Sequence, residues 1–374
     1  MKLVIFGLTI SSSWGNGHAT LWRGLCRALA RRGHEVVFFE RDVPYYALNR
    51  DLVALPDGEL CLYPNWDDGL PLARWHLADA DVAMVTSYCP DGIAASDLVL
   101  DSAVSVRTFY DLDTPVTLAR LEAGEPVDYI GPRGLGEFDL VLSYTGGRAL
   151  TELQARLGAR RVAPLYGSVD PEVYRRTAPA LQYRADLSYM GTYAADRQPA
   201  LEQLLVEPAR RLPERRFLIG GAQYPEAFPW AGNIFFVRHL PPGEHPAFYS
   251  SSRLTLNITR AAMAQMGYCP SGRLFEAAAC GAPLLSDAWV GLDAFFQPSS
   301  EILVAYDTDS AIRALELSDA ELARIASRAR ERTLAEHTAD RRAVELESAI
   351  EHAASRMLPA PGHARPGAAV AGAN

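Results

Sequence analysis

The chain has 374 residues, which is enough for two domains of ordinary size. Hydrophobic residues make up 49% of it and charged residues 22%, a composition typical of globular proteins. The formal net charge of −9 argues against nucleic acid as a partner, and no apolar run approaches the roughly 18 residues of a membrane span.

The number and spacing of the cysteines indicate the redox environment of the protein. The five cysteines are Cys26, Cys61, Cys89, Cys269 and Cys280, an odd number without CxxC or metal-ligand spacing. This pattern predicts a reduced, cytoplasmic protein with neither disulfides nor zinc.

The first half of the chain alternates strands and helices. An apolar, β-branched strand at 2–8 is followed by a small-residue loop, a helix over about 19–32 and a strand at 35–39. Further strands are expected at 59–63, 81–86, 104–109, 139–143 and 161–166. The alternation predicts a parallel, doubly wound α/β sheet, a Rossmann-like domain over residues 1–168.

The second half repeats this architecture after turn residues at 167–171. Strands are expected at 186–191, 216–221, 234–237, 253–259, 282–287 and 301–306, and helices at 197–212, 244–251, 271–281, 308–335 and 339–356. These elements predict a second domain over 169–338, and the Pro- and Gly-rich composition of 358–374 predicts a disordered tail.

The helix that begins after Ser271 has an unusual first turn. Ser271 is a suitable N-cap, but Arg273 follows in the first turn, where the helix dipole disfavours a cation. A docked anion would explain it, and Glu276, one turn later, would then accept hydrogen bonds from vicinal hydroxyls. An ion pair between Arg273 and Glu276 on a solvated face explains the spacing equally well.

The stretch Arg273-Leu-Phe-Glu276-Ala-Ala-Ala-Cys-Gly-Ala-Pro resembles the nucleotide-sugar helix of GT-B glycosyltransferases, most closely the spore-maturation (CgeB-type) group. The resemblance implies two Rossmann-like domains facing across a cleft, with helix 339–357 crossing back to the first domain. It also implies transfer, without metal or other cofactor, from a nucleotide-diphosphate sugar to a hydroxyl- or amine-bearing acceptor. Glu276 matches the second Glu of the family's Glu-x7-Glu motif, and Tyr268 replaces the first.

The resemblance extends to other loops of the second domain. Gly191 and Thr192 follow its first strand. Arg197, like Arg273, is a cation at the start of a helix, although it could instead pair with Asp196 or Glu202. The predicted donor-binding residues are Gly191, Thr192, Arg197, His239, Asn257, Arg260, Ser271, Gly272, Arg273 and Glu276.

In the first domain, the glycine-rich loop before the first helix ends at His18, where inverting GT-B enzymes carry the base that deprotonates the acceptor. A role in capping the loop is the alternative for His18. Asp111 or Asp113 is expected to orient this imidazole, although Asp113 could also cap a helix. The predicted catalytic residues are His18 and Asp111, and the predicted acceptor-binding residues are Trp14, Asn16, Gly17, Tyr110 and Asp113.

Other functions fit parts of the sequence. Loss of the first motif Glu, now Tyr268, favours a nucleotide-sugar-binding protein without transferase activity. A nucleotide-sugar 2-epimerase shares the fold but needs more carboxylates around the sugar. Glu40 occupies the usual ribose position of a nicotinamide oxidoreductase, but Thr20 stands where the third glycine of Gly-x-Gly-x-x-Gly belongs.

Overall fold

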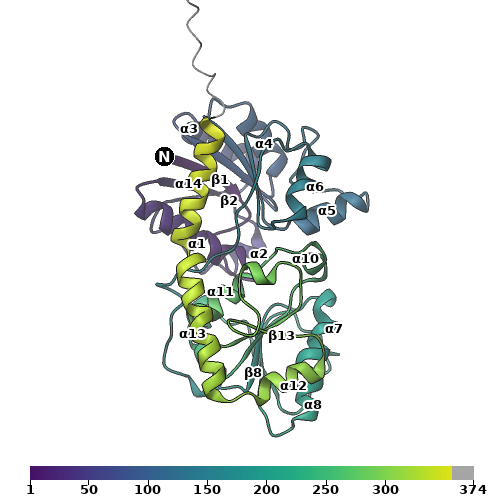
Figure 1. The fold of residues 1–374 in the computed structure, drawn as a ribbon. Helices are drawn as coiled ribbons and strands as arrows, with labels where there is room; N and C mark the ends of the chain where they lie inside the picture. The colour runs from purple at the N-terminus through teal and green to yellow at the C-terminus, as the bar shows by residue number, and fades with distance from the viewer. Residues whose placement is uncertain (356–374) are drawn as a thin grey trace, which may run out of the picture.

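The computed structural model of the protein describes residues 1–355. They form two α/β lobes stacked end to end, each with one parallel sheet between layers of helices (Figure 1). None of the helices in this part of the chain combines the length and apolarity that crossing a bilayer requires. The predicted tail at 358–374 lies outside the described residues.

The first lobe holds a seven-stranded sheet in the order β3-β2-β1-β4-β5-β6-β7. Its strands are β1 (Lys2–Gly7), β2 (Glu35–Arg41), β3 (Glu59–Tyr63), β4 (Val82–Thr86), β5 (Val106–Asp111), β6 (Leu140–Ser143) and β7 (Val162–Pro164). Its helices are α1 (His18–Arg31), α2 (Pro44–Ala47), α3 (Trp66–Leu77), α4 (Gly92–Leu100), α5 (Thr114–Glu122) and α6 (Arg148–Leu157). All the strand pairings are parallel, as the alternating pattern predicts.

The second lobe holds a six-stranded parallel sheet in the order β10-β9-β8-β11-β12-β13. Its strands are β8 (Leu187–Met190), β9 (Phe217–Gly221), β10 (Ile234–Arg238), β11 (Thr255–Asn257), β12 (Leu284–Asp287) and β13 (Leu303–Ala305). Its helices are α7 (Gln198–Leu201), α8 (Glu207–Arg211), α9 (His245–Ser250), α10 (Ala261–Met266), α11 (Gly272–Ala279), α12 (Thr308–Glu316) and α13 (Asp319–Glu336). A π-helical turn, Glu202–Val206, joins α7 to α8.

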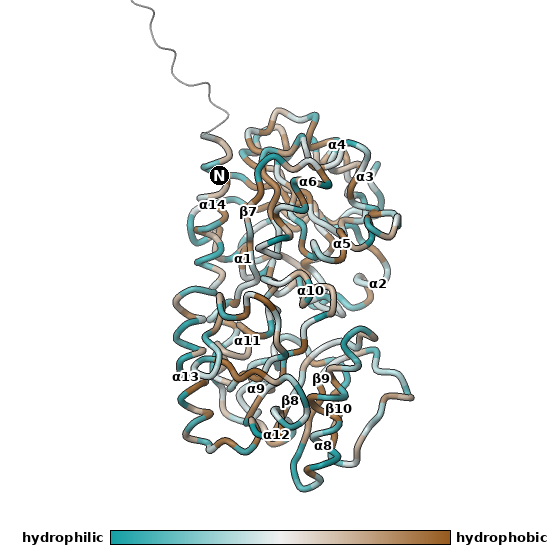
Figure 2. The backbone as a smooth tube through the Cα atoms, turned by 45° about the vertical axis from the view of Figure 1, so that its right-hand side comes forward, coloured by the Kyte–Doolittle hydropathy of each residue, from teal (hydrophilic) through white to brown (hydrophobic). Residues whose placement is uncertain are grey.

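Burial explains why the strands are continuous apolar runs. Helices cover both faces of each sheet, so strands such as β1 and β4 are buried along their whole length. Figure 2 shows the same arrangement in the second lobe, where the hydrophobic strands β8 and β9 lie inside and hydrophilic segments lie at the surface. Two separate cores form on the two faces of each sheet.

The chain crosses between the lobes twice, and the two crossings lie side by side. Val169 on the first crossing exchanges backbone hydrogen bonds with His337 and Ala339 on the second. Beyond this point α14 (Ala339–Ser355) packs against α1, β5 and β6 of the first lobe (Figure 1). Buried Arg342 holds the junction by donating to the carbonyl oxygens of Tyr166 and Gly167.

One expected strand end is wrong in a way that matters for the site. Strand β5 continues through Asp111, so this side chain belongs to the sheet rather than to the loop beyond it. Strand β11 ends at Asn257, two residues before the expected end at 259, and Asn257 belongs to the sheet as the expected range implies. The single helix expected at 308–335 is two helices, because Ser318 and Glu321 form a capping box that starts α13.

Candidate active site between the two sheets

A cavity of about 520 Å³ lies between the lobes. Its walls come from residues that follow strand ends in both sheets, such as Leu112 after β5, Tyr144 after β6, Gly191 after β8 and His239 after β10. The carboxyl edges of the two parallel sheets therefore face the same space. This edge is where open α/β sheets bind ligands.

Two arginines from separate helix starts meet in this cavity. Arg197 Nη2 donates to the Thr192 carbonyl oxygen at 2.7 Å, and Arg273 donates to the Met190 carbonyl oxygen and to Ser271 Oγ. The pKa of Arg197 is lowered, first by burial and then by the charge of Arg273. Arg197 Nε is buried and has no hydrogen-bond partner among the described residues.

The ion pairs considered as alternatives from the sequence do not form. Asp196 lies 3.5 Å from Arg260 Nε, and Glu202 accepts from Gln198 at 2.7 Å. Within residues 1–355, Arg197 and Arg273 contact only neutral oxygens. The charge of Glu276 acts on Arg273, but neither arginine forms an ion pair within the described residues. Two such half-buried cations in one cavity are suited to bind an anion with more than one charge.

Glu276 lines the same cavity as these arginines and is only 8% exposed. Burial raises the pKa of its carboxyl group, and the Tyr174 hydroxyl, the charge of Arg273 and the hydroxyls of Thr20 and Tyr249 oppose that rise. Thr20 belongs to α1 of the first lobe, and its Oγ1 lies 3.4 Å from Glu276 Oε1. The carboxylate therefore faces the gap between the lobes, surrounded by groups that hydroxyls of a ligand can replace.

Ser271 does not cap α11 with its side chain as expected. The residue stands at the N-cap position, but no side-chain cap bond forms, and its hydroxyl accepts from Arg273 Nε at 3.1 Å. The backbone N–H groups of the first turn are thus left toward the cavity, which Ser271, Gly272 and Arg273 all line.

On the opposite wall, the loop after β1 presents His18 to the cavity. Asn16 Oδ1 accepts from the His18 backbone N–H at 3.1 Å, and Asn16 Nδ2 donates to the Thr9 carbonyl oxygen. Asn16 therefore performs the capping that was the alternative role for His18. The imidazole ring lies 6.4 Å, centroid to centroid, from the ring of Tyr88.

The structure corrects the two residues expected from the end of β5. Asp111 is fully buried, does not line the cavity and accepts from the Asp113 N–H and from Thr117 Oγ1, so it makes no contact with His18. Tyr110 is a core residue whose hydroxyl donates to the Leu165 carbonyl oxygen at 2.6 Å. Asp113, just beyond the strand, lines the cavity instead.

Asn257, which was predicted to bind the donor, does not line the cavity either. It is 5% exposed within β11, and its Nδ2 donates to Ser286 Oγ at 3.2 Å. Trp14 does not line the cavity but contacts His239 of the second lobe, with ring centroids 4.0 Å apart and ring planes tilted by 46°. The other predicted residues that line the cavity are Asn16, Gly17, His18, Asp113, Gly191, Thr192, Arg197, His239, Arg260, Ser271, Gly272, Arg273 and Glu276.

Tyr268, which stands in place of the first Glu of the Glu-x7-Glu motif, makes contacts between the two lobes. It has a positive φ of 48°, and its carbonyl oxygen accepts from the Gly146 N–H of the first lobe at 2.9 Å. Its ring packs so closely on Gly147 and Gly291 that a Cβ atom at either would lie 2.6 Å from it. The position is therefore occupied by an interdomain contact rather than by a second carboxylate.

Sequence reasoning missed the tyrosines of the site. Tyr88 and Tyr144 follow β4 and β6 and line the cavity, and Tyr174 and Tyr249 surround Glu276. The rule that ligands bind at strand carboxyl ends, applied to every strand, would have found Tyr88 and Tyr144. No local signal marks Tyr174 or Tyr249, because tertiary packing alone brings them to α11.

Glu40, the ribose-binding candidate for a nicotinamide cofactor, is occupied by its own domain. It is fully buried and accepts from the hydroxyls of Thr9 and Ser11 and from the backbone N–H groups of Ile10 and Ser11. A carboxylate with four internal donors has little capacity left for a ribose, which removes the main support for an oxidoreductase.

Comparisons with known proteins agree with this geometry. A family profile described as "Glycosyl transferase-like" matches residues 197–348. No curated protein is a significant relative by sequence. The assignment to the CgeB-type group within such proteins therefore stays a prediction.

Solved structures show the fold as GT-B. Sucrose-phosphate synthase from Thermosynechococcus elongatus superposes with a TM-score of 0.72 at 15% identity, covering 95% of this chain and all of that one. Anabaena HepE in complex with UDP-glucose superposes with a TM-score of 0.64 at 12% identity, covering 94% of this chain and 100% of HepE. An alpha-glucosyltransferase in complex with UDP and a 13-mer DNA superposes with a TM-score of 0.68 at 13% identity, covering 94% of this chain and 99% of that one. Together with the family match, these neighbours support the prediction of a glycosyltransferase-type enzyme.

Proposed function

We propose that the protein is a glycosyltransferase that moves a sugar from a nucleotide-diphosphate sugar to a hydroxyl- or amine-bearing acceptor. The observation that carries this proposal is the pair Arg197 and Arg273, two half-buried cations that share one cavity and contact only neutral oxygens. A diphosphate supplies charged acceptor oxygens, which neither guanidinium contacts within the described residues.

The same groups would favour the reaction itself. When the bond from the sugar to the diphosphate breaks, negative charge grows on the leaving phosphate. The two guanidiniums and the N–H groups at the start of α11 are already in place to stabilise that charge, which is commonly the largest contribution to catalysis. We propose that these groups neutralise the phosphate without a metal ion and that Glu276 accepts hydrogen bonds from the ribose.

His18 is the proposed general base. His18 lines the cavity from the first lobe, whereas the arginines line it from the second, and an acceptor bound between the lobes would place its hydroxyl or amine near His18. General-base catalysis contributes about 10²–10⁴-fold. Deprotonation of the acceptor by His18 and direct attack on the sugar carbon would invert the stereochemistry. If the enzyme retained it, the donor site would be unchanged and His18 would lose this role.

The acceptor is proposed to be a small molecule or a glycan. One structural neighbour was solved with DNA, but the net charge of −9 here opposes binding of a phosphate backbone. Two neighbours hold UDP or UDP-glucose, which makes UDP-sugars the first donors to test. All five cysteines are free thiols, and we propose a cytoplasmic location on that ground.

The test measures UDP binding by calorimetry, and sugar transfer and donor hydrolysis with a panel of nucleotide sugars. Arg273→Ala is expected to lose UDP binding, whereas His18→Ala is expected to keep binding and lose about 10²–10⁴-fold in transfer rate. Arg216→Ala is the control, because Arg216 stacks on Phe235 and does not line the cavity. Wild-type transfer by both site variants would refute the mechanism.

A binding protein without transferase activity is the second candidate. It is favoured by the lack of any contact between His18 and a carboxylate in residues 1–355. Nucleotide-sugar binding with no product from any acceptor would support it. A 2-epimerase is less well supported, because Asp113 and Glu276 are the only carboxylates that line the described cavity.

A further inference from the structure

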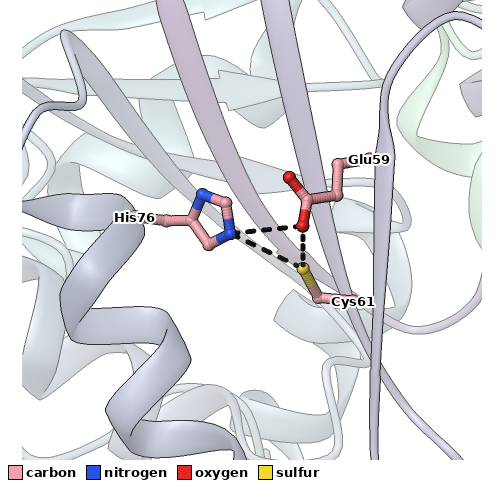
Figure 3. A group of neighbouring side chains, drawn as sticks. All are labelled: Glu59, Cys61 and His76. Atoms are coloured by element: carbon pink, nitrogen blue, oxygen red, sulfur yellow. Dashed lines mark hydrogen bonds and ion pairs between the residues drawn. The ribbon is translucent and has the colours of Figure 1, made fainter.

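Three metal-ligand side chains meet far from the nucleotide site, at the outer edge of the first sheet (Figure 3). Strand β3 forms that edge. Glu59 and Cys61 are two residues apart on β3, so their side chains leave the same face of the strand. Helix α3 packs against β3 and brings His76 to the same point. Glu59 is exposed, and the other two residues are buried.

The distances among the three ligand atoms fit a metal ion. Cys61 Sγ lies 3.6 Å from Glu59 Oε1 and 3.9 Å from His76 Nε2, and the nitrogen lies 3.5 Å from Oε1. Zinc binds sulfur at about 2.3 Å and nitrogen or oxygen at about 2.0–2.2 Å, so tetrahedral ligands lie about 3.3–3.6 Å apart. A movement of a few tenths of an ångström would complete that geometry.

His76 gives an independent reason to expect a ligand. Its side chain is only 1% exposed and packs edge-on against Phe39 and Trp75. Nδ1 has no hydrogen-bond partner in the described residues, and Nε2 is directed only at Cys61 and Glu59 (Figure 3). Nδ1 lies on the side of the ring away from the cluster, so Nε2 is the atom that indicates a ligand. Its nearest partners are a thiol at 3.9 Å and a carboxylate oxygen at 3.5 Å, which are long for hydrogen bonds, whereas a cation between the three groups would bind one atom of each.

We propose that Glu59, Cys61 and His76 bind one zinc ion, with a fourth position open to water on the solvent side of Glu59. Thiolate and imidazole are ligands that select zinc over magnesium or calcium. Zinc would replace the proton of the Cys61 thiol, which passes to the buffer, and the thiolate and carboxylate would balance its charge. The ion would tie α3 to the unprotected edge strand and stabilise the first lobe.

The experiment uses full-length, tag-free protein that has been freed of metal with a chelator. Zinc is titrated in competition with a chromogenic chelator, and cobalt(II) is then added in its place. One equivalent of zinc is expected to bind and to raise Tm, and cobalt is expected to give a sulfur-to-metal charge-transfer band. Glu59→Gln changes an exposed side chain and should fold normally, yet lose at least about 100-fold in affinity, since even outer-shell partners contribute about 10–100-fold.

Cys61→Ser should abolish the charge-transfer band. Cys89→Ser is its matched control, because Cys89 is also a free, buried cysteine of the first lobe and lies in the same core. Retention of the band in this control is expected. Failure of the wild-type protein to bind zinc at micromolar concentration, or binding that is unchanged in Glu59→Gln and Cys61→Ser, would overturn the proposal.

Discussion

The arginine pair predicts an unusual separation between stability and binding. Replacing Arg197 by Met keeps an unbranched apolar stem but removes the guanidinium, with its charge and its hydrogen bond to the Thr192 carbonyl oxygen. In the protein without ligand, that charge faces Arg273 and pairs with no carboxylate in the described residues. Its removal should therefore cost little stability, although it removes half of the proposed diphosphate site.

The magnitudes follow from the contacts. The lost hydrogen bond from the charged guanidinium to Thr192 is worth about 1.5–3 kcal/mol, and relief of a buried cation with an unpartnered Nε offsets part of it. We expect the free energy of unfolding to fall by no more than about 2 kcal/mol, against about 3–5 kcal/mol for breaking a buried ion pair. Loss of a charged hydrogen bond to phosphate costs about 1.5–3 kcal/mol, which weakens UDP binding about 10–150-fold.

Thermal or urea unfolding with and without UDP measures both effects. At a UDP concentration 100 times the wild-type Kd, ligand binding should raise the free energy of unfolding of the wild-type protein by about 2.7 kcal/mol. The increase for Arg197→Met should be only about 0.4 kcal/mol if its affinity is 100-fold weaker, or about 1.4 kcal/mol if it is tenfold weaker. Arg216→Met is the control and should respond to UDP as the wild type does. The reasoning is refuted if Arg197→Met loses 3 kcal/mol or more without ligand, or keeps full UDP affinity.

Three further predictions concern positions around the cavity. Burial raises the pKa of Asp111 from 3.8 to about 6, so the folded state favours the protonated form and loses stability as pH rises from about 4 through 6. Relative to wild type, the free energy of unfolding of Asp111→Asn should therefore rise by about 2.4 kcal/mol between pH 4 and pH 8, measured by urea unfolding. Parallel pH profiles of the two proteins would contradict this. Gly191→Ala places a Cβ atom 2.5 Å from Arg273 Nη1 and should weaken UDP binding about tenfold without removing a charge, whereas Gly232→Ala, in open space, should not. Gly147 has a φ of 57°, and in Gly147→Ala the Cβ atom would lie 2.6 Å from the Tyr268 ring. The substitution should therefore lower the free energy of unfolding by about 1–3 kcal/mol. An unchanged urea midpoint would show that the contact between the lobes can shift at little cost.

Local pattern was sufficient wherever one segment carries the information. Apolar β-branched runs separated by helices predict two parallel sheets, because strands covered on both faces have to be apolar along their length. The spacing of Arg273 and Glu276 on one helix likewise predicts that both face the same side, one turn apart. These features depend on backbone periodicity, which sequence shows directly.

Errors of one or two residues at strand ends had large effects on the site. Extending β5 from residue 109 to Asp111 moves that carboxylate from the cleft into the core and leaves Asp113 at the cavity. Asn257 is a different case, because the strand expected at 253–259 already included it, and β11 keeps it in the sheet. Hydrogen bonding to neighbouring strands sets where a strand ends, and a single sequence does not show those neighbours.

By itself, the sequence determined two Rossmann-like halves and an arginine at each of two helix starts in the second half. Only the tertiary structure decided that the two guanidiniums share one cavity, that His18 lies on the opposite wall, and that Glu59, Cys61 and His76 meet at a sheet edge. The physical reason is that secondary structure follows from contacts a few residues apart, whereas these sites require strand order and domain packing to join segments distant in the chain.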